Sequence, residues 1–300
     1  MTRAVRKWSL AIGAVGLLLM IAGCARGEAR VVARPSATPR ASELGYHRVL
    51  DIDFEKPPGS VGAVASSFEM YRSSSIAVDV LRIGEAQLTY SAGVGGGQAL
   101  SFPSKATIGK GRIVLRVLTL TDPDPLSPGR ADFAFGVDIR VDEQSSADDG
   151  DNVMQRGLFQ DTAQYKIQLD DHRPSCRIAG NEGEVTVVGT DRVEPGRWYR
   201  LRCLREGAKV VLTVAKIDTN GVAASPSVWS DFRPTGSVAV MRTSTPISVG
   251  GKIATDGSVV AENTDQFNGS MDNLFFEVFG SKDDGTITPA PRGTPTPSRS

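Results

Sequence analysis

The sequence predicts an all-β domain built as an antiparallel β-sandwich or jelly roll. Apolar and polar residues alternate in one short segment after another, the pattern of a strand with one buried face and one wet face. Clusters of Gly, Asn, Asp and Pro separate these segments and favour tight turns. No long helical period follows residue 24. The region 46–280, about 235 residues long, has the size of one all-β domain.

The alternating segments follow one another along the chain. The plainest predicted strands lie at 50–55, 133–141, 165–169, 199–203 and 210–214. Turns are predicted at 180–183, 194–196, 206–207, 219–221 and 255–257. The closing strand is predicted after residue 271, with Asp272 in phase with the apolar residues Leu274, Phe276 and Val278 and therefore on the inward face.

The N-terminus predicts export. Arg3, Arg6 and Lys7 precede an apolar stretch, 8–23, which is shorter than the about 20 apolar residues that span a bilayer. A basic start, a short apolar run and small residues before a cut site describe a secretory signal peptide at 1–23. Ile21-Ala22-Gly23-Cys24 resembles the lipobox of bacterial lipoproteins. That resemblance implies that Cys24 carries lipid such as palmitate and anchors the protein to the cell membrane, on its extracytoplasmic face. A plain secretory signal and an uncleaved anchor helix are the alternatives.

Two segments outside the predicted domain are poor in apolar residues. Residues 24–45 are rich in Ala, Arg, Ser and Pro, and we interpret them as a flexible tether that carries the lipid at its first residue. Residues 281–300 are rich in Thr, Pro, Arg and Ser, a composition that cannot bury enough apolar surface to fold. The sequence therefore predicts a signal peptide, a tether, one domain and a disordered tail.

Charge and cysteine content narrow the function classes. The formal net charge is zero, and removal of the signal peptide with its three positive charges leaves about −3, which does not favour nucleic-acid binding. Once Cys24 is set aside, Cys176 and Cys203 remain, and in an exported chain they predict one disulfide; two free buried thiols are the alternative. Only two histidines are present, which leaves little material for a zinc site or for histidine-based catalysis.

Several motifs, taken in order, are similar to those of laminin-G-like and concanavalin A-like jelly rolls. The resemblance spans most of 46–280, and its motifs lie at 95–103 (GGGQALSFP), 132–141, 151–157, 165–169, 196–203 (GRWYRLRC) and 267–274 (FNGSMDNL). It implies a jelly roll of a kind that serves as lectin, adhesion module, glycanase or lyase. Because one fold carries many activities, the resemblance leaves the function open.

The resemblance also implies a structural calcium ion. In such jelly rolls an aspartate at the position of Asp272 binds calcium together with acids of the first strand, which are Asp53 and Glu55 here. Calcium takes six to eight oxygen ligands, so carbonyls and water would complete the set. A strand cap or a salt bridge with an arginine is the alternative for Asp272. The acidic loop with Asp148, Asp149 and Asp151 is either a second calcium site or a solvated turn.

A polar strand face is the candidate ligand surface. The outward positions of the predicted strands hold planar polar groups and one tryptophan, which suit a sugar: Asp138, Arg140, Lys166, Gln168, Trp198, Arg200 and Arg202. An ordinary wet sheet face, or a tryptophan covered by a loop, is the alternative. Trp229 is equally ambiguous.

Catalytic signals are weak. A glycosidase needs two carboxylates across its cleft, and the Glu-x-Asp-x-x-Glu strand of the glycanases with this fold is absent, although Asp51, Asp53 and Glu55 share one strand face. His47 and His172 lie in apparent turns, and Gly-x-Ser-x-Gly is absent. We therefore expect a non-enzymatic, membrane-anchored binding module for a polysaccharide or glycoprotein. The alternatives are a structural or protein-interaction module of the cell envelope and a divergent polysaccharide hydrolase or lyase.

Overall fold

The computed structural model describes residues 46–55, 61–65, 74–105, 111–143, 150–239, 245–260 and 265–279. All of them belong to one compact unit within 41–300. The predicted signal peptide, the tether, the tail, Cys24, Asp148 and Asp149 lie outside the described residues. In the part of the chain that is described, no helix is long and apolar enough to cross a membrane.

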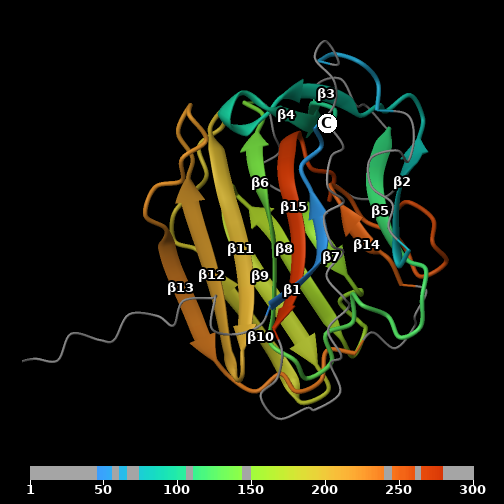
Figure 1. Cartoon of the computed structure of the whole chain (residues 1–300), viewed down its shortest axis with the longest axis vertical. Helices are drawn as coiled ribbons and strands as arrows, with labels where there is room; N and C mark the ends of the chain where they lie inside the picture. Colours follow the sequence, from blue (N-terminus) through green and yellow to red (C-terminus); the bar gives the residue numbers. More distant parts are fainter. Residues whose placement is uncertain are drawn as a thin grey trace, which may run out of the picture. The chain divides into compact units, whose positions relative to one another are not determined.

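Two antiparallel sheets make up the unit, which confirms the predicted sandwich (Figure 1). Sheet A has, from edge to edge, β13 (Ser227–Phe232), β12 (Lys209–Lys216), β11 (Trp198–Glu206), β6 (Phe133–Val141), β15 (Gly269–Phe279), β4 (Gln98–Ser101) and β3 (Thr89–Ala92), with β1 (Tyr46–Ile52) also paired to β15. Sheet B has β10 (Gly183–Val188), β9 (Arg173–Gly180), β8 (Gln164–Asp170), β7 (Asp151–Arg156), β14 (Ile247–Val249), β5 (Arg112–Thr119) and β2 (Ile76–Ile83). A short 3-10 turn, η1 (Val94–Gly96), joins β3 to β4.

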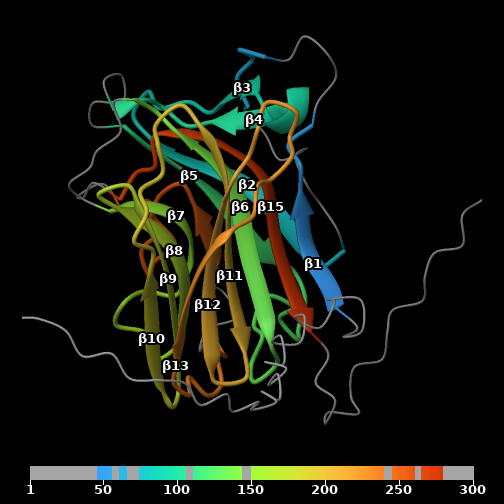
Figure 2. The same ribbon diagram turned by 90° about the vertical axis from the view of Figure 1, so that its left-hand side faces the viewer.

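The core lies between the two sheets, which form separate layers in the view of Figure 2. Four aromatic residues meet at its centre, Phe133, Phe135 and Phe276 from sheet A and Tyr165 from sheet B. The rings of Phe135 and Tyr165 have centroids 5.0 Å apart. Large buried rings remove much apolar surface from water, so this cluster contributes strongly to holding the sheets together.

The predicted alternation matches the observed strands, except at 50–55, where β1 begins earlier and ends at Ile52. Tyr199, Leu201 and Cys203 of β11 are buried, while Arg200 between them is exposed. The predicted segments at 133–141, 165–169 and 210–214 lie in β6, β8 and β12. His47 differs from the prediction, because it lies within β1 opposite Val278 rather than in a turn.

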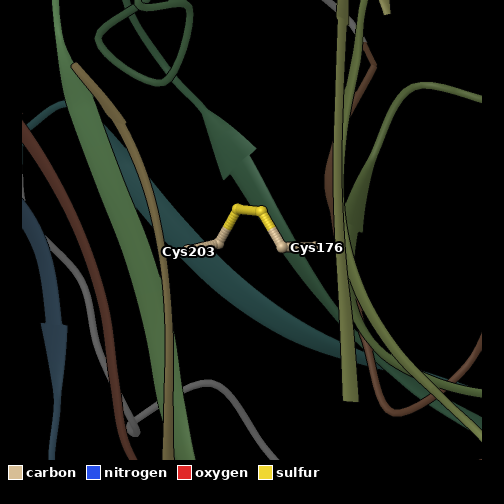
Figure 3. Close-up of a disulfide and its surroundings, with 2 residues drawn as sticks. All are labelled: Cys176 and Cys203. Atoms are coloured by element: carbon tan, nitrogen blue, oxygen red, sulfur yellow. A yellow bond between two sulfur atoms is a disulfide. The ribbon is translucent and has the colours of Figure 1, made fainter. Parts of the chain in front are cut away.

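One disulfide joins the sheets, as predicted for this cysteine pair (Figure 3). Cys176 of β9 lies in sheet B and Cys203 of β11 in sheet A, with their Cα atoms 5.7 Å apart. Both side chains are fully buried in the core. The bond therefore crosses the interior of the sandwich and links two strands that do not pair with each other.

A β-bulge in β15 corrects the prediction for Asp272. Asp272 pairs with Asp138 and Phe275 pairs with Gly136, so two residues of β15 face one residue of β6 between these pairs. Such a bulge shifts the alternation by one residue. Leu274 and Phe276 are in the core and Val278 packs against it, as predicted, but Asp272 lies on the outer face of sheet A and Met271 takes the core position instead.

Candidate functional site

A groove on the outer face of sheet A is the main candidate site. Its volume is about 410 Å³. It is lined by residues of β1, β11 and β15, namely Arg48, Asp51, Arg200, Arg202, Asn273, Phe275, Glu277 and Phe279. Figure 1 shows these three strands in the same layer, with β6 between β11 and β15.

Small residues on β6 explain why a groove forms there. Gly136 lies between Arg202 of β11 and Phe275 of β15, and Ala134 lies next to Glu277 in the following outward row. Neither residue has a side chain long enough to fill the space between the larger neighbours. A Cβ atom added at Gly136 would lie 2.7 Å from the Phe275 ring, so this ring packs against the bare backbone of β6. Phe275 and Phe279 thus provide the apolar surface of the groove, and the other lining side chains are polar or charged.

The arginines of the groove are held by carboxylates. Arg200 donates two hydrogen bonds of 2.8 Å to Asp138, which is almost fully buried, and this contact raises the arginine pKa further above its ordinary value. The Asn273 amide also donates to Asp138, at 3.0 Å. Two-point contacts of this kind fix a guanidinium group in one orientation. The remaining N–H groups of Arg200 therefore have a defined direction before any ligand arrives.

The second row of the groove is fixed by Glu277. Arg202 Nη2 donates to Glu277 Oε1 at 2.6 Å, and Arg48 Nη2 lies 3.7 Å from Glu277 Oε2. Arg48 also donates to Asp51 at 3.0 Å, and its guanidinium lies 5.2 Å from the centroid of the Phe275 ring. Arg48 therefore connects the acids of the groove with its aromatic surface.

The structure divides the predicted ligand residues between two sheets. Asp138, Arg140, Trp198, Arg200 and Arg202 share the outer face of sheet A, where the cross-strand register brings them together. Lys166 and Gln168, in contrast, are outward residues of β8 in sheet B, on the opposite side of the sandwich, and cannot belong to the same surface. Alternation shows which residues point outward, but it does not show to which sheet a strand belongs.

Neither predicted tryptophan lines the groove. Trp198 is partly buried, with the guanidinium of Arg140 5.1 Å from its ring centroid. Trp229 is partly buried and packs against the core. The aromatic residues of the groove are Phe275 and Phe279 instead.

Sequence reasoning missed six of the lining residues as ligand contacts, namely Arg48, Asp51, Asn273, Phe275, Glu277 and Phe279. A signal for part of this set was present, because the residues from Asn273 to Phe279 alternate outward on the closing strand. A second signal was Gly136, since a glycine inside a strand often marks a close approach of backbone or ligand.

The predicted calcium ligands lie at the upper rim of sheet A, around the turn between β3 and β4. Asp272 Oδ2 accepts a hydrogen bond of 3.0 Å from Val94 N, and its Oδ1 accepts one of 2.8 Å from Asn273 N. Glu55 Oε1 accepts from Gln98 N at 2.9 Å. Asp53 Oδ1 accepts from Glu55 N at 3.1 Å. The structure brings Asp272 and Glu55 to the same turn, but each carboxylate is directed at backbone N–H groups.

This donor arrangement does not fit a calcium ion. Calcium needs six to eight oxygens directed at one point, whereas both oxygens of Asp272 already accept backbone hydrogen bonds. Among the residues that the structure describes, no group of three His, Cys, Asp or Glu is placed to hold a metal. Calcium binding stays a prediction for Asp272, Asp53 and Glu55, and for the acidic segment that includes Asp151, which the structure places at the start of β7 rather than in a loop.

Burial of Asp272 changes its acidity. The side chain is 2% exposed, and removal from water raises its pKa to about 6, against the lowering effect of the two backbone hydrogen bonds. The nearby charges of Asp138 and Glu55 also raise the pKa. Asp272 is therefore a titratable group that holds the rim of sheet A.

Comparison with known proteins supports the fold. Residues 153–277 match the family model of the laminin G domain, which is less than half of the chain. A search of curated proteins gives no match.

Solved structures give distant matches. Domain 4 of AbnA, an extracellular arabinanase from Geobacillus stearothermophilus, in complex with arabinotriose, is 13% identical with a TM-score of 0.43, over 68% of this chain and 82% of that one. The enzymatically active domain of tailspike protein 2 of bacteriophage CBA120 is 13% identical with a TM-score of 0.47, over 71% of this chain and 30% of that one. The LG1-3 region of the laminin alpha2 chain is 9% identical with a TM-score of 0.38, over 73% of this chain and 68% of that one.

Proposed function

We propose that this chain, which contains a laminin-G-like domain, is a non-catalytic module that binds carbohydrate in the groove of sheet A. The observation that carries the proposal is the groove along β6, in which Arg202, held by Glu277, faces the Phe275 ring across Gly136. A sugar presents an apolar C–H face and a rim of hydroxyl groups. A site for it needs an apolar surface together with a few oriented polar groups, and the groove offers both.

The polar groups of the groove suit hydroxyl ligands. Arg200 and Arg202 are each held by a carboxylate on one edge and keep further N–H donors, and Asn273 offers an amide oxygen. Binding to groups that are already ordered costs less conformational entropy than binding to free side chains. A polysaccharide or the glycan of a glycoprotein is therefore the ligand class that we propose.

The acids of the groove support a binding role over a hydrolytic one. Asp51 and Glu277 are the carboxylates that line the groove, and both contact Arg48. A glycosidase needs two carboxyl groups that are free to act on the glycosidic bond, whereas both of these carboxylates are already engaged by arginine. A divergent hydrolase or lyase is therefore the less favoured alternative.

Membrane anchoring is the second part of the proposal. It is supported by the lipobox-like sequence that ends at Cys24 and by the basic and apolar segments before it. The chain would then present its domain on the extracytoplasmic face of the cell membrane, with 25–45 as a tether. Two or three acyl chains anchor a protein stably, because each buried methylene contributes about 0.8 kcal/mol.

Glycan binding by groove variants tests the proposal. A glycan array identifies a ligand, and titration calorimetry then compares Phe275→Ala and Arg48→Gln with the wild type. Phe232→Ala and Arg197→Gln are the matched controls, because Phe232 is 71% exposed on the edge strand β13 and Arg197 is exposed in a turn. We expect each groove variant to weaken binding about 3- to 10-fold, the effect of losing one stacking or charged contact, and the controls to bind as the wild type does.

Four outcomes would contradict the proposal. A flat glycan array, or equal binding by both groove variants and the wild type, would remove the groove as a carbohydrate site. Retention of a protein partner from membranes without any glycan retention would favour a protein-interaction module. Release of product from a panel of polysaccharides would show an enzyme.

A further inference from the structure

A second cavity lies on the outer face of sheet B, on the side of the sandwich opposite the groove. Its volume is about 240 Å³. The floor is formed by Gln155 of β7 and Ser248 of β14, which pair directly across the two strands. Two loops enclose it, 157–163 after β7 and 253–257 after β14. No part of it is shared with the groove of sheet A.

The chemistry of the cavity differs from that of the groove. Its polar side chains are amides and hydroxyls, with a single carboxylate, in the set Gln155, Gln160, Asp161, Thr162, Thr245, Ser248 and Thr255. Leu158, Pro246 and Ile253 add an aliphatic surface. The described lining residues include no lysine or arginine. Two cations lie beside the floor without lining the cavity, Lys166 opposite Gln155 and Arg116 opposite Ser248. Arg116 is bound to Asp79.

Gln155 is the residue that points to a ligand. Its side chain is 3% exposed, and its amide Nε2 donates to the carbonyl of Gly157 at 2.7 Å. Its Oε1 accepts no hydrogen bond from the described residues. This oxygen is also not sealed from solvent. The amide is thus fixed by its nitrogen, and its unpaired oxygen reaches the cavity that the residue lines.

We propose that this cavity is a second binding site, which takes a single neutral sugar residue. Sites for drug-sized ligands have volumes of about 300–1,000 Å³, so this smaller cavity suits one ring. Hydroxyl and amide groups pair with the hydroxyls of a sugar, and the aliphatic residues contact its C–H face. The lack of a lining cation disfavours an anionic ligand. The site rests on its own residues and does not depend on the groove.

Two variants test the site by different means. Thr255→Trp places a large ring at the exposed rim and blocks the cavity, while Thr219→Trp makes the same change in an exposed turn elsewhere. Gln155→Met removes the amide but keeps the length of the side chain. Because Gln164 also donates to the Gly157 carbonyl, at 3.0 Å, that carbonyl keeps a partner in the methionine variant.

The probes are the methyl glycosides of glucose, galactose and mannose, with methyl glucuronide and glucosamine as charged counterparts. Saturation-transfer NMR and titration measure binding to the full chain. We expect a neutral glycoside to bind with a Kd of about 1 mM, as expected for so small a ligand. Thr255→Trp should weaken it at least about 10-fold and Gln155→Met about 3- to 10-fold, the effect of one hydrogen bond. Thr219→Trp should leave it unchanged.

Other results would overturn the proposal. Binding that survives Thr255→Trp, or that falls equally in Thr219→Trp, would show that the cavity is not the site. Loss of binding in Phe275→Ala would assign the sugar to the groove of sheet A. Tighter binding of the glucuronide or the amine would show a charged ligand, and failure of every neutral glycoside to saturate would show no sugar site.

Discussion

Asn273 adopts a left-handed backbone conformation, with φ of +49°, at the bulge of β15. Asparagine tolerates this conformation better than most residues. The bulge places the Asp272 carboxylate on the outer face of sheet A, and the Asn273 amide holds Asp138, which in turn holds Arg200. One residue thus sets the orientation of two acids. The sequence does not reveal the bulge, because an asparagine in a strand is compatible with regular pairing as well as with a bulge.

The raised pKa of Asp272 makes stability depend on pH. The folded-state pKa of about 6 exceeds the ordinary aspartate pKa of 3.8, so the folded protein holds this proton more tightly than the unfolded chain does. Below pH 3.8 the carboxyl group is protonated in both the folded and the unfolded state, so it makes no contribution to the pH dependence of stability. Between pH 3.8 and about 6 the free energy of unfolding falls as the pH rises. We expect the wild type to lose on the order of 1–2 kcal/mol from this group between pH 4 and pH 7, measured by urea unfolding.

Asp272→Asn provides the control, because it should lack the loss between pH 4 and pH 7. A wild type and variant with parallel pH profiles would contradict the prediction.

Calcium binding at Asp272 has a test of its own. An ion bound there would stabilise the carboxylate and raise the melting temperature in the presence of calcium. An unchanged melting temperature with calcium or chelator would count against the predicted calcium site.

Single strands could be predicted from the sequence, but their partners could not. The segments that became β6, β8, β11 and β12 show their buried faces through strict alternation. Whether β8 lies beside β11 or behind it depends on contacts between distant parts of the chain. For this reason Lys166 and Arg200 were predicted on one surface, although they lie on opposite sheets.

The disulfide is the covalent link between strands of the two sheets. Its cysteines are separated by 27 residues, and closing a loop of this length restricts the unfolded chain by about 3–4 kcal/mol in the chain-entropy model. We expect reduction to lower the free energy of unfolding by that amount, measured by urea unfolding with and without reductant. The double variant Cys176→Ala, Cys203→Ala should start near the lower stability and show no response to reductant. Reaction of both cysteines with a thiol reagent in the denatured, unreduced protein would contradict the prediction.

The domain as a whole was predictable, whereas its groove was not. Ordered motifs along 46–280 predicted the laminin-G-like jelly roll, because each marks a strand that this fold needs. The groove combines Arg48 near the start of the domain with Phe275 near its end. These residues meet only because β1 pairs with β15, which no local pattern reports.

Lipidation belongs to the scale of the whole molecule, because it determines where the domain works. We expect metabolic labelling with palmitate to mark the full chain and to be lost in Cys24→Ala, since the thiol is the acceptor that a lipobox implies. Labelling that survives Cys24→Ala would contradict this. Cys176→Ala serves as the matched control and should keep the label, because Cys176 is bonded to Cys203 inside the domain.

The cross-sheet disulfide has a mechanical consequence. If the domain is pulled from its ends, the segment between Cys176 and Cys203 cannot extend, so the stretched chain is shorter by about 90 Å. Arg200 and Arg202 lie inside this locked segment, whereas Arg48 and Phe275 lie outside it. Because β1 pairs with β15 and Tyr46 lies opposite Phe279, tension on the two ends would separate Arg48 from Phe275, while Arg200 and Arg202 lie in a segment that the intact bond shields from tension. A ligand held between the two halves of the groove would therefore be released at the start of unfolding.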